Sequence, residues 1–164
     1  MSFTIRGAQP HAGHTVDIDE CVPLTVQWPG YARLREAPQS VVLDVGASLV
    51  EVKTDRDSGE VVELVLVDVG RPEDSDPPLL VPGAMESGVP LMSYDESIQD
   101  GSAGGVHLYT DGLRVRFGEE GAARAVGDPT AVFGFSELGH LVEFDVRLDL
   151  DRMAQLRTVC GLVG

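Results

Sequence analysis

LVEFDVRLDL, residues 141–150, is the stretch of sequence that indicates the fold most directly. Apolar and charged side chains alternate along it, which is typical of a β-strand with one face on a core and the other in water. The apolar face holds Val142, Phe144, Val146, Leu148 and Leu150, and the charged face holds Glu143, Asp145, Arg147 and Asp149. We therefore expect a strand over residues 141–150 whose charged face is solvated.

The hairpin partner of this strand is expected at residues 131–136, with Gly139 in the connection available for a positive φ. A second hairpin is expected from residues 47–55 and 60–69, joined by the turn DRDSG. Its second strand is apolar on both faces, so we expect it to be central and covered twice, by a second layer or by a C-terminal helix. Shorter strands are expected at residues 3–6, 24–28 and 41–45.

A third hairpin centres on Asp111-Gly112, a strong two-residue turn signal. With these two residues as the turn, Tyr109 pairs with Arg114, and His107 pairs with Arg116. This register places five apolar side chains on one face: Val106, Leu108, Leu113, Val115 and Phe117. A slip by one residue would mix apolar and charged side chains on both faces, so the pattern favours this register.

The last segment with helical spacing is residues 151–160, which Asp149 or Asp151 could cap and Gly161 could end. Residues 70–105 contain five prolines and indicate a long irregular segment, and residues 1–20 could be a loose N-terminal segment. For the 164 residues we expect one mainly β domain. Its antiparallel hairpins would form a sandwich or flattened barrel with one short C-terminal helix, and an α+β fold is the alternative.

A short internal similarity joins the two halves of the chain. GEVVELVL, residues 59–66, is similar to GHLVEFDV, residues 139–146. A duplication would produce two related sheets, whereas two strands that each follow a turn glycine would explain the match more simply. From the sequence we favour the simpler explanation.

The charge balance excludes several classes of partner. The chain has 12 basic and 27 acidic residues, which gives a formal net charge of −15. Such a surface repels nucleic acid and anionic membranes, and no apolar run approaches the roughly 18 residues of a membrane span. Because no apolar signal-peptide stretch follows the N-terminus, we expect a cytoplasmic protein in which Cys21 and Cys160 stay reduced. The single Lys and the lack of Asn are typical of a GC-rich bacterial genome.

Two groups of residues are candidates for binding. One is the charged face of the third hairpin, which holds His107, Tyr109, Arg114 and Arg116. Two guanidiniums beside a phenol and an imidazole could bind a carboxylate or a phosphate. The other is the pair His11 and His14, a weak candidate for a metal site because two imidazoles still need further ligands.

Recognisable catalytic and cofactor motifs are missing from the sequence. Residues 55–60 begin like a calcium loop, but the sixth and twelfth positions are Glu60 and Leu66 instead of Gly and Glu. No phosphate-binding loop, nucleophile elbow or dinucleotide fingerprint is present. We therefore expect no cofactor and assign no catalytic residue.

These observations favour a soluble acidic binding or interaction module without catalytic activity, which could dock a basic partner protein. One alternative is a small-ligand-binding protein or enzyme that uses the hairpin face. Another is a metal-dependent protein that uses the two N-terminal histidines. Nothing in the sequence decides whether the chain forms a homo-oligomer.

Overall fold

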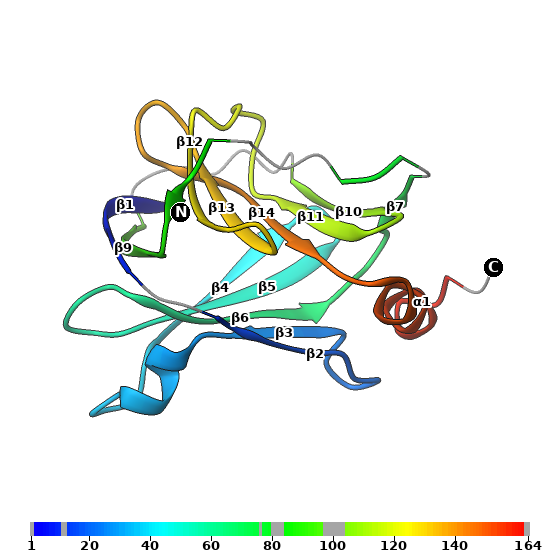
Figure 1. The fold of residues 1–164 in the computed structure, drawn as a ribbon, viewed down its shortest axis with the longest axis horizontal. Coiled ribbons are helices and arrows are strands. Elements are labelled where there is room, and N and C mark those ends of the chain that lie inside the picture. Colours follow the sequence, from blue (N-terminus) through cyan, green and yellow to red (C-terminus); the bar gives the residue numbers. More distant parts are fainter. Residues whose placement is uncertain (1, 11–12, 76, 80–83, 97–103, 163–164) are drawn as a thin grey trace.

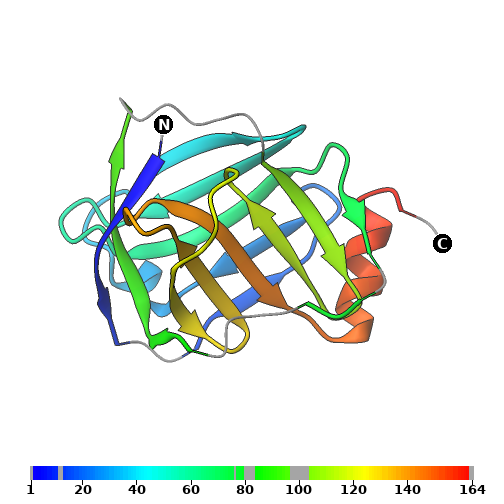
Figure 2. The ribbon, with the colours of Figure 1, turned by 90° about the horizontal axis from the view of Figure 1, so that it is seen from above.

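The computed structural model describes residues 2–10, 13–75, 77–79, 84–96 and 104–162. Within these ranges the chain forms 14 strands in three sheets, one α-helix and one 3-10 helix. The two larger sheets face each other across a shared apolar core, which makes the molecule a β-sandwich (Figure 1). Viewed from above, the strands of one sheet cross those of the other at a large angle (Figure 2). The prediction of a mainly β protein with a short C-terminal helix is confirmed.

The first large sheet comes from the N-terminal half of the chain. Its strands are β2 (Thr15–Asp17), β3 (Leu24–Gln27), β4 (Gln39–Val45), β5 (Ser48–Thr54) and β6 (Val61–Asp68), in the spatial order β2-β3-β6-β5-β4. All neighbouring strands are antiparallel. β6 is central, as its two apolar faces predict, and residues 61–66 are all buried. The 3-10 helix η1 (Pro29–Arg33) packs against β6.

The second large sheet comes from the C-terminal half of the chain. Its strands are β7 (Glu73–Asp74), β8 (Glu86–Ser87), β10 (Gly105–Tyr109), β11 (Gly112–Arg116), β12 (Arg124–Asp128), β13 (Ala131–Phe135) and β14 (Leu141–Arg147). Their spatial order is β7-β10-β11-β14-β13-β12-β8. β7 and β8 are two-residue strands that add in parallel to the two edges. The five strands between them form an antiparallel sheet.

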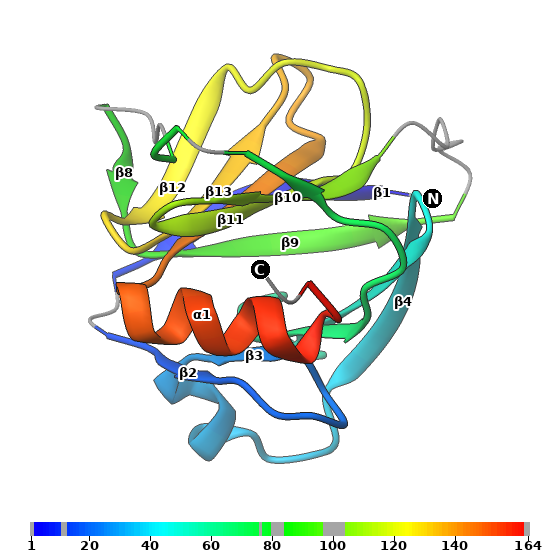
Figure 3. The ribbon, with the colours of Figure 1, turned by 90° about the vertical axis from the view of Figure 1, so that its right-hand side faces the viewer.

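Two elements close the ends of the sandwich. β1 (Ser2–Gln9) and β9 (Val89–Asp95) form a separate antiparallel pair at one end. The helix α1 (Leu150–Val159) lies across the opposite end, between the two large sheets (Figures 1 and 3). The Asp149 side chain caps α1 by accepting a hydrogen bond from the Arg152 backbone N–H, and Met153 and Leu156 are fully buried. Among the described residues, no helix has the length and apolar character needed to cross a membrane.

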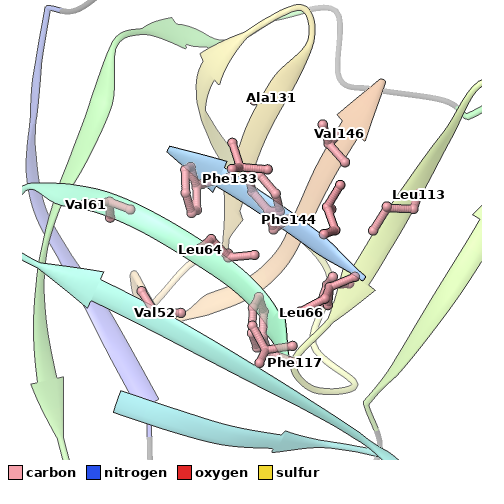
Figure 4. Packing of buried hydrophobic residues seen from close by; sticks show 14 of the residues in the cluster. Val52, Val61, Leu64, Leu66, Leu113, Phe117, Ala131, Phe133, Phe144 and Val146 are labelled. Atoms are coloured by element: carbon pink, nitrogen blue, oxygen red, sulfur yellow. The ribbon is translucent and has the colours of Figure 1, made fainter. Parts of the chain in front are cut away.

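The core lies between the two large sheets and draws on both of them (Figure 4). Phe133 and Phe144 stack with ring centroids 4.6 Å apart, and Trp28 lies 5.4 Å from Phe133. Leu64 and Leu66 of the facing sheet are fully buried. Each such side chain contributes about 1.5–3 kcal/mol by burial, so this layer supplies most of the driving force for folding.

Residues 141–150 differ from the expectation in two ways. β14 ends at Arg147, and Leu150 begins α1, where it is 77% exposed. The charged face is not solvated either, because Glu143 is 6% exposed and Asp145 is 1% exposed. Alternation determines which way side chains point, but it does not reveal what covers them. β14 is the middle strand of its sheet, and arginines from β11 lie over these carboxylates.

The interpretations of residues 1–20 as loose and of residues 70–105 as irregular need correction at two strands, while residues 1, 11–12, 76, 80–83 and 97–103 of these segments lie outside the described residues. Ser2–Gln9 form β1, and Phe3 within it is 1% exposed. Val89–Asp95 form β9 within the proline-rich segment. The two strands pair with each other, so the backbone of each strand forms its ladder hydrogen bonds with a segment far away in the sequence. A pairing over so large a separation leaves no local pattern.

The register of the third hairpin is shifted by two residues from the expected one. Tyr109 pairs with Gly112 and His107 pairs with Arg114, so Thr110 and Asp111 form the turn. Gly112 is the first residue of β11 and lies so close to β14 that a Cβ there would be 2.4 Å from the Val146 carbonyl oxygen, so the position requires glycine. A shift by two preserves the faces, and the five apolar side chains expected to be buried are 0–4% exposed.

The two halves of the chain repeat one topology. In chain order, strands β1–β6 of the first half correspond to strands β9–β14 of the second half. The spatial order also agrees, because β2-β3-β6-β5-β4 in one sheet matches β10-β11-β14-β13-β12 in the other. The similar segments at residues 59–66 and 139–146 lead into the central strands β6 and β14. The Trp28 N–H donates to the Val62 carbonyl at 3.0 Å, and the Phe117 N–H donates to the Val142 carbonyl at 2.9 Å.

The end sheet lies on the approximate twofold axis that relates the halves. Ile5 of β1 pairs directly with Met92 of β9. The Ile5 N–H donates to the Gly139 carbonyl, and the Met92 N–H donates to the Gly59 carbonyl, both at 2.8 Å. Both glycines have positive φ, 77° at Gly59 and 83° at Gly139, as the turns require. The internal similarity therefore marks a structural repeat rather than two unrelated turns.

Candidate functional site

The four residues of the predicted hairpin face lie together on the outer side of β10 and β11. His107, Tyr109, Arg114 and Arg116 are all partly exposed. The guanidinium of Arg114 binds the Asp145 carboxylate in a bidentate manner, with distances of 2.8 Å and 2.9 Å. Arg116 Nη1 lies 3.1 Å from Glu143 Oε2. His107 Nδ1 lies 3.0 Å from Glu73 Oε2. The structure thus brings the predicted residues together, but beside carboxylates of this chain.

The carboxylates beneath this face are held in place by packing as well as charge. A Cβ on Gly134 would lie 2.7 Å from Glu143 Cγ, so the glycine makes room for the glutamate side chain. Burial and the charge of Asp145 raise the pKa of Glu143, while the two guanidiniums oppose this shift. The hydrogen bond to Asp145 raises the pKa of Arg114 further. An external anion at this face would have to compete with two buried carboxylates for the same donors.

Of the two N-terminal histidines, His14 is described, and His11 lies outside the described residues. The His14 side chain is 10% exposed, with Nδ1 3.2 Å from Asp128 Oδ2. Its Nε2 lies 3.4 Å from Thr130 Oγ1. Burial opposes ionisation of Asp128, yet hydrogen bonds from Thr130 and Ala131 and the nearby imidazole hold the pKa of Asp128 below its usual value. Asp128 and Thr130 therefore lie beside the two ring nitrogens of His14.

His14 forms part of the wall of two neighbouring hollows. The larger is a polar cleft of ≈ 600 Å³ lined by His14, Thr15, Val16, Thr130, Arg147, Leu148, Asp149 and Arg152. The smaller is a mainly apolar hollow of ≈ 210 Å³ lined by Gly13, His14, Thr15, Gln27, Trp28, Pro29 and Ala32. No local sequence pattern marks this site, because the walls of the cleft come from β2, the β12–β13 turn, the end of β14 and the start of α1. Asp128-Pro129-Thr130 was the one local signal, and it indicates only a turn.

Metal ligands and thiols do not form a cluster in the described part of the chain. There, no group of three or more His, Cys, Asp or Glu side chains is placed to hold a metal ion. Cys21 is exposed, Cys160 is half-buried, and both are free thiols. Burial raises the pKa of the Cys160 thiol, which disfavours the reactive thiolate.

A third surface is the outer face of β4, β5 and β6, which we call the acidic sheet face. Cross-strand pairing places its side chains in two rows, Asp44–Leu49–Asp68 and Val42–Glu51–Val65. Val42 is 50% exposed, Asp44 is exposed two residues further along β4, and Asp68 is exposed on β6. Lys53 borders this face, where its Nζ lies 2.8 Å from Glu63 Oε1 and 3.6 Å from Glu51 Oε1.

Comparison with protein-family models found no match to this chain, and comparison with curated proteins found no significant relative.

Proposed function

We propose that this protein is an interaction module without catalytic activity, and that its acidic sheet face docks a basic partner protein. The observation that carries the proposal is the exposure of Val42 beside Asp44 and Glu51 on the outer face of the sheet. Val42 offers a partner an apolar contact, and the carboxylates beside it offer ion pairs to a basic partner.

The distribution of charge supports a basic partner. Within the described residues, at least six of the 12 basic residues pair with carboxylates of the same chain: Lys53, Arg114, Arg116, Arg124, Arg147 and Arg157. The surplus of 15 negative charges is therefore carried by carboxylates such as Asp44 and Asp68. A positively charged partner would be steered to this face, and its association would weaken as salt rises.

The same charges argue against a second copy of this chain as the partner on this face. A symmetric contact would bring Asp44 and Asp68 of one copy against those of the other. Like charges brought together at an interface cost several kcal/mol. A ligand at the hairpin face is less favoured, because Arg114 and Arg116 already bind Asp145 and Glu143.

Matched charge reversals test this proposal. Partners are captured on the immobilised protein from a lysate of the source organism, and the Kd of each purified partner is measured by calorimetry at several salt concentrations. Replacing Asp44 and Asp68 by Lys should weaken binding of a basic partner by more than about tenfold, since two attractive pairs become repulsive. The control replaces Glu119 and Glu137 by Lys, which changes net charge equally at exposed loop positions, and should preserve binding.

Equal weakening by both pairs of substitutions would mean that only net charge matters, and would overturn the assignment of the face. The same conclusion would follow if every captured partner bound the reversed and wild-type proteins alike. Light scattering measures the molar mass of the purified protein, and a dimer that the Asp44 and Asp68 reversals disrupt would show that a second copy covers the face instead.

A further inference from the structure

The structural repeat creates two corresponding junctions, and these two junctions differ. In the C-terminal half, Gly104 precedes β10 and lies against the β4–β5 turn. In the N-terminal half, His14 precedes β2 and lies against the β12–β13 turn. The repeat therefore relates the junction of Gly104 with the β4–β5 turn to the junction of His14 with the β12–β13 turn.

The glycine junction is closed by backbone. A Cβ on Gly46 would lie 2.6 Å from the Gly104 carbonyl oxygen, so a side chain at Gly46 would collide with the neighbouring backbone. The histidine junction is held apart by side chains and opens into the polar cleft on one side and the apolar hollow on the other. At this junction the backbone fills the space in the C-terminal half, whereas the N-terminal half has two hollows there.

Groups that donate hydrogen bonds dominate the polar cleft. Arg147 binds Asp111 and the Leu79 carbonyl, and Arg152 binds the Val16 carbonyl. A guanidinium has five N–H donors, so these bonds use only part of each group. The Arg147 side chain is 39% exposed, and Arg152 is exposed.

His14 adds an imidazole to this wall. Its Nδ1 is buried and makes no directed hydrogen bond with any described residue, although Asp128 lies 3.2 Å away. Asp149 is the one carboxylate among the residues that line the cleft, and it is engaged as the cap of α1. Arg147, Arg152 and His14, which come from three separate parts of the fold, therefore line one open cleft in an otherwise acidic protein.

We propose that this cleft binds a small organic anion, with the anionic group between Arg147 and Arg152 and an apolar group in the hollow beside Trp28. Guanidinium groups bind phosphate and carboxylate oxygens through paired N–H donors. The apolar hollow adjoins the cleft, because His14 and Thr15 line both. This site shares no residue with the acidic sheet face, so anion binding is tested independently of partner docking.

The chain contains its own reporter for this site, because Trp28 is the only tryptophan. Titration with phenyl phosphate at constant ionic strength should change Trp28 fluorescence and saturate. Inorganic phosphate lacks the apolar group and should bind about tenfold more weakly, since burial of a ring is worth at least one decade in affinity. Benzylamine has the ring with the opposite charge and should not bind.

Four single substitutions locate the ligand. Arg152→Ala should weaken phenyl phosphate binding about tenfold by removing charge-assisted hydrogen bonds, whereas Arg124→Ala, at an exposed arginine paired with Glu86 elsewhere, should leave it unchanged. Ala32→Phe fills the apolar hollow and should reduce phenyl phosphate binding to the level of inorganic phosphate. Asp149→Asn keeps a good helix cap but removes the carboxylate, so it should strengthen binding.

The proposal is overturned if phenyl phosphate gives no saturable change, or binds no better than inorganic phosphate. It is also overturned if Arg124→Ala weakens binding as much as Arg152→Ala, because only overall charge would then be involved. Ala32 and Arg152 are both exposed, so neither substitution threatens the fold. Circular dichroism confirms this for each variant.

Discussion

The central strands of the two halves bury a glutamate at corresponding positions, but each half neutralises it differently. Glu63 of β6 is 7% exposed; it accepts a hydrogen bond from Gln27 at 2.7 Å and pairs with Lys53 at 2.8 Å. Glu143 of β14 is 6% exposed and pairs with Arg116. Gln27 and Arg116 occupy the same position opposite the glutamate. The repeat therefore preserves the buried acid and varies the partner that satisfies it.

The two halves also differ at the position two residues after the buried glutamate. Val65 in β6 corresponds to Asp145 in β14, and Thr25, opposite Val65, corresponds to Arg114. The C-terminal half thus adds a complete ion pair where the N-terminal half has an apolar and a hydroxyl side chain. It uses its cations for its own stability, whereas the N-terminal half leaves carboxylates and Val42 at the surface.

The largest effect should come from breaking the added ion pair on one side. Arg114→Ala leaves Asp145, which is 1% exposed, without its bidentate partner. Removing one member of a buried pair destabilises a protein by about 3–5 kcal/mol. Urea unfolding measures this loss. The corresponding Thr25→Ala should change the free energy of unfolding by less than about 0.5 kcal/mol, and equal effects would show that the halves are balanced alike.

A smaller loss is expected from Arg116→Ala. The sequence alone predicts an exposed charge of little consequence, but Arg116 faces buried Glu143. Leaving a buried acceptor poorly satisfied costs about 1–3 kcal/mol. Arg114 Nε still lies 3.3 Å from Glu143, which keeps the loss below that of Arg114→Ala. Thermal unfolding checks this order, and an unchanged Tm would restore the sequence-based expectation.

The raised pKa of Glu143 predicts the sign of one pH effect. Because the folded state holds this proton more tightly than the unfolded state, the free energy of unfolding falls as pH rises from the usual glutamate pKa of 4.5 through the raised pKa. Glu143→Gln removes this dependence. The free energy of unfolding of the wild type, minus that of the variant, should therefore decrease with pH across this window. The slope is at most about 1.4 kcal/mol per pH unit for one proton.

The smallest loss of stability is expected when residues of the C-terminal half are replaced by their counterparts in the N-terminal half. The double substitution Arg114→Thr and Asp145→Val gives β11 and β14 the residues found at the corresponding positions of β3 and β6. Replacing a buried ion pair by packed uncharged side chains is often neutral or stabilising by about 1–4 kcal/mol. A loss as large as that of Arg114→Ala alone would show that the ion pair is required by the C-terminal half.

Most strands and the helix could be predicted because their signals are local. The strand pattern at residues 60–69, the turn glycines, and the spacing of Met153 and Leu156 all act within a few residues. The faces of the third hairpin were predicted correctly although its register was not. Side-chain direction has a period of two, so a shift by two residues leaves every face unchanged.

The site around His14 could not be predicted in the same way. His14 lies 114 residues before Asp128 in the sequence, and nothing local to either residue indicates the other. The hairpin face was found as a set of neighbours, but its chemistry was not. The carboxylates that bind Arg114 and Arg116 belong to β14, a strand 27–31 residues further along the chain.

The sequence by itself determined the class of fold, the faces of most strands and the acidic character of the surface, because periodicity, turn chemistry and charge are properties of short segments and of composition. Tertiary structure decided the end of β14 at Arg147, the pairing of β1 with β9, the burial of Glu143 and Asp145, and the opening beside His14. Each of these depends on which distant strand lies alongside, and that is settled by the packing of two whole sheets around one core.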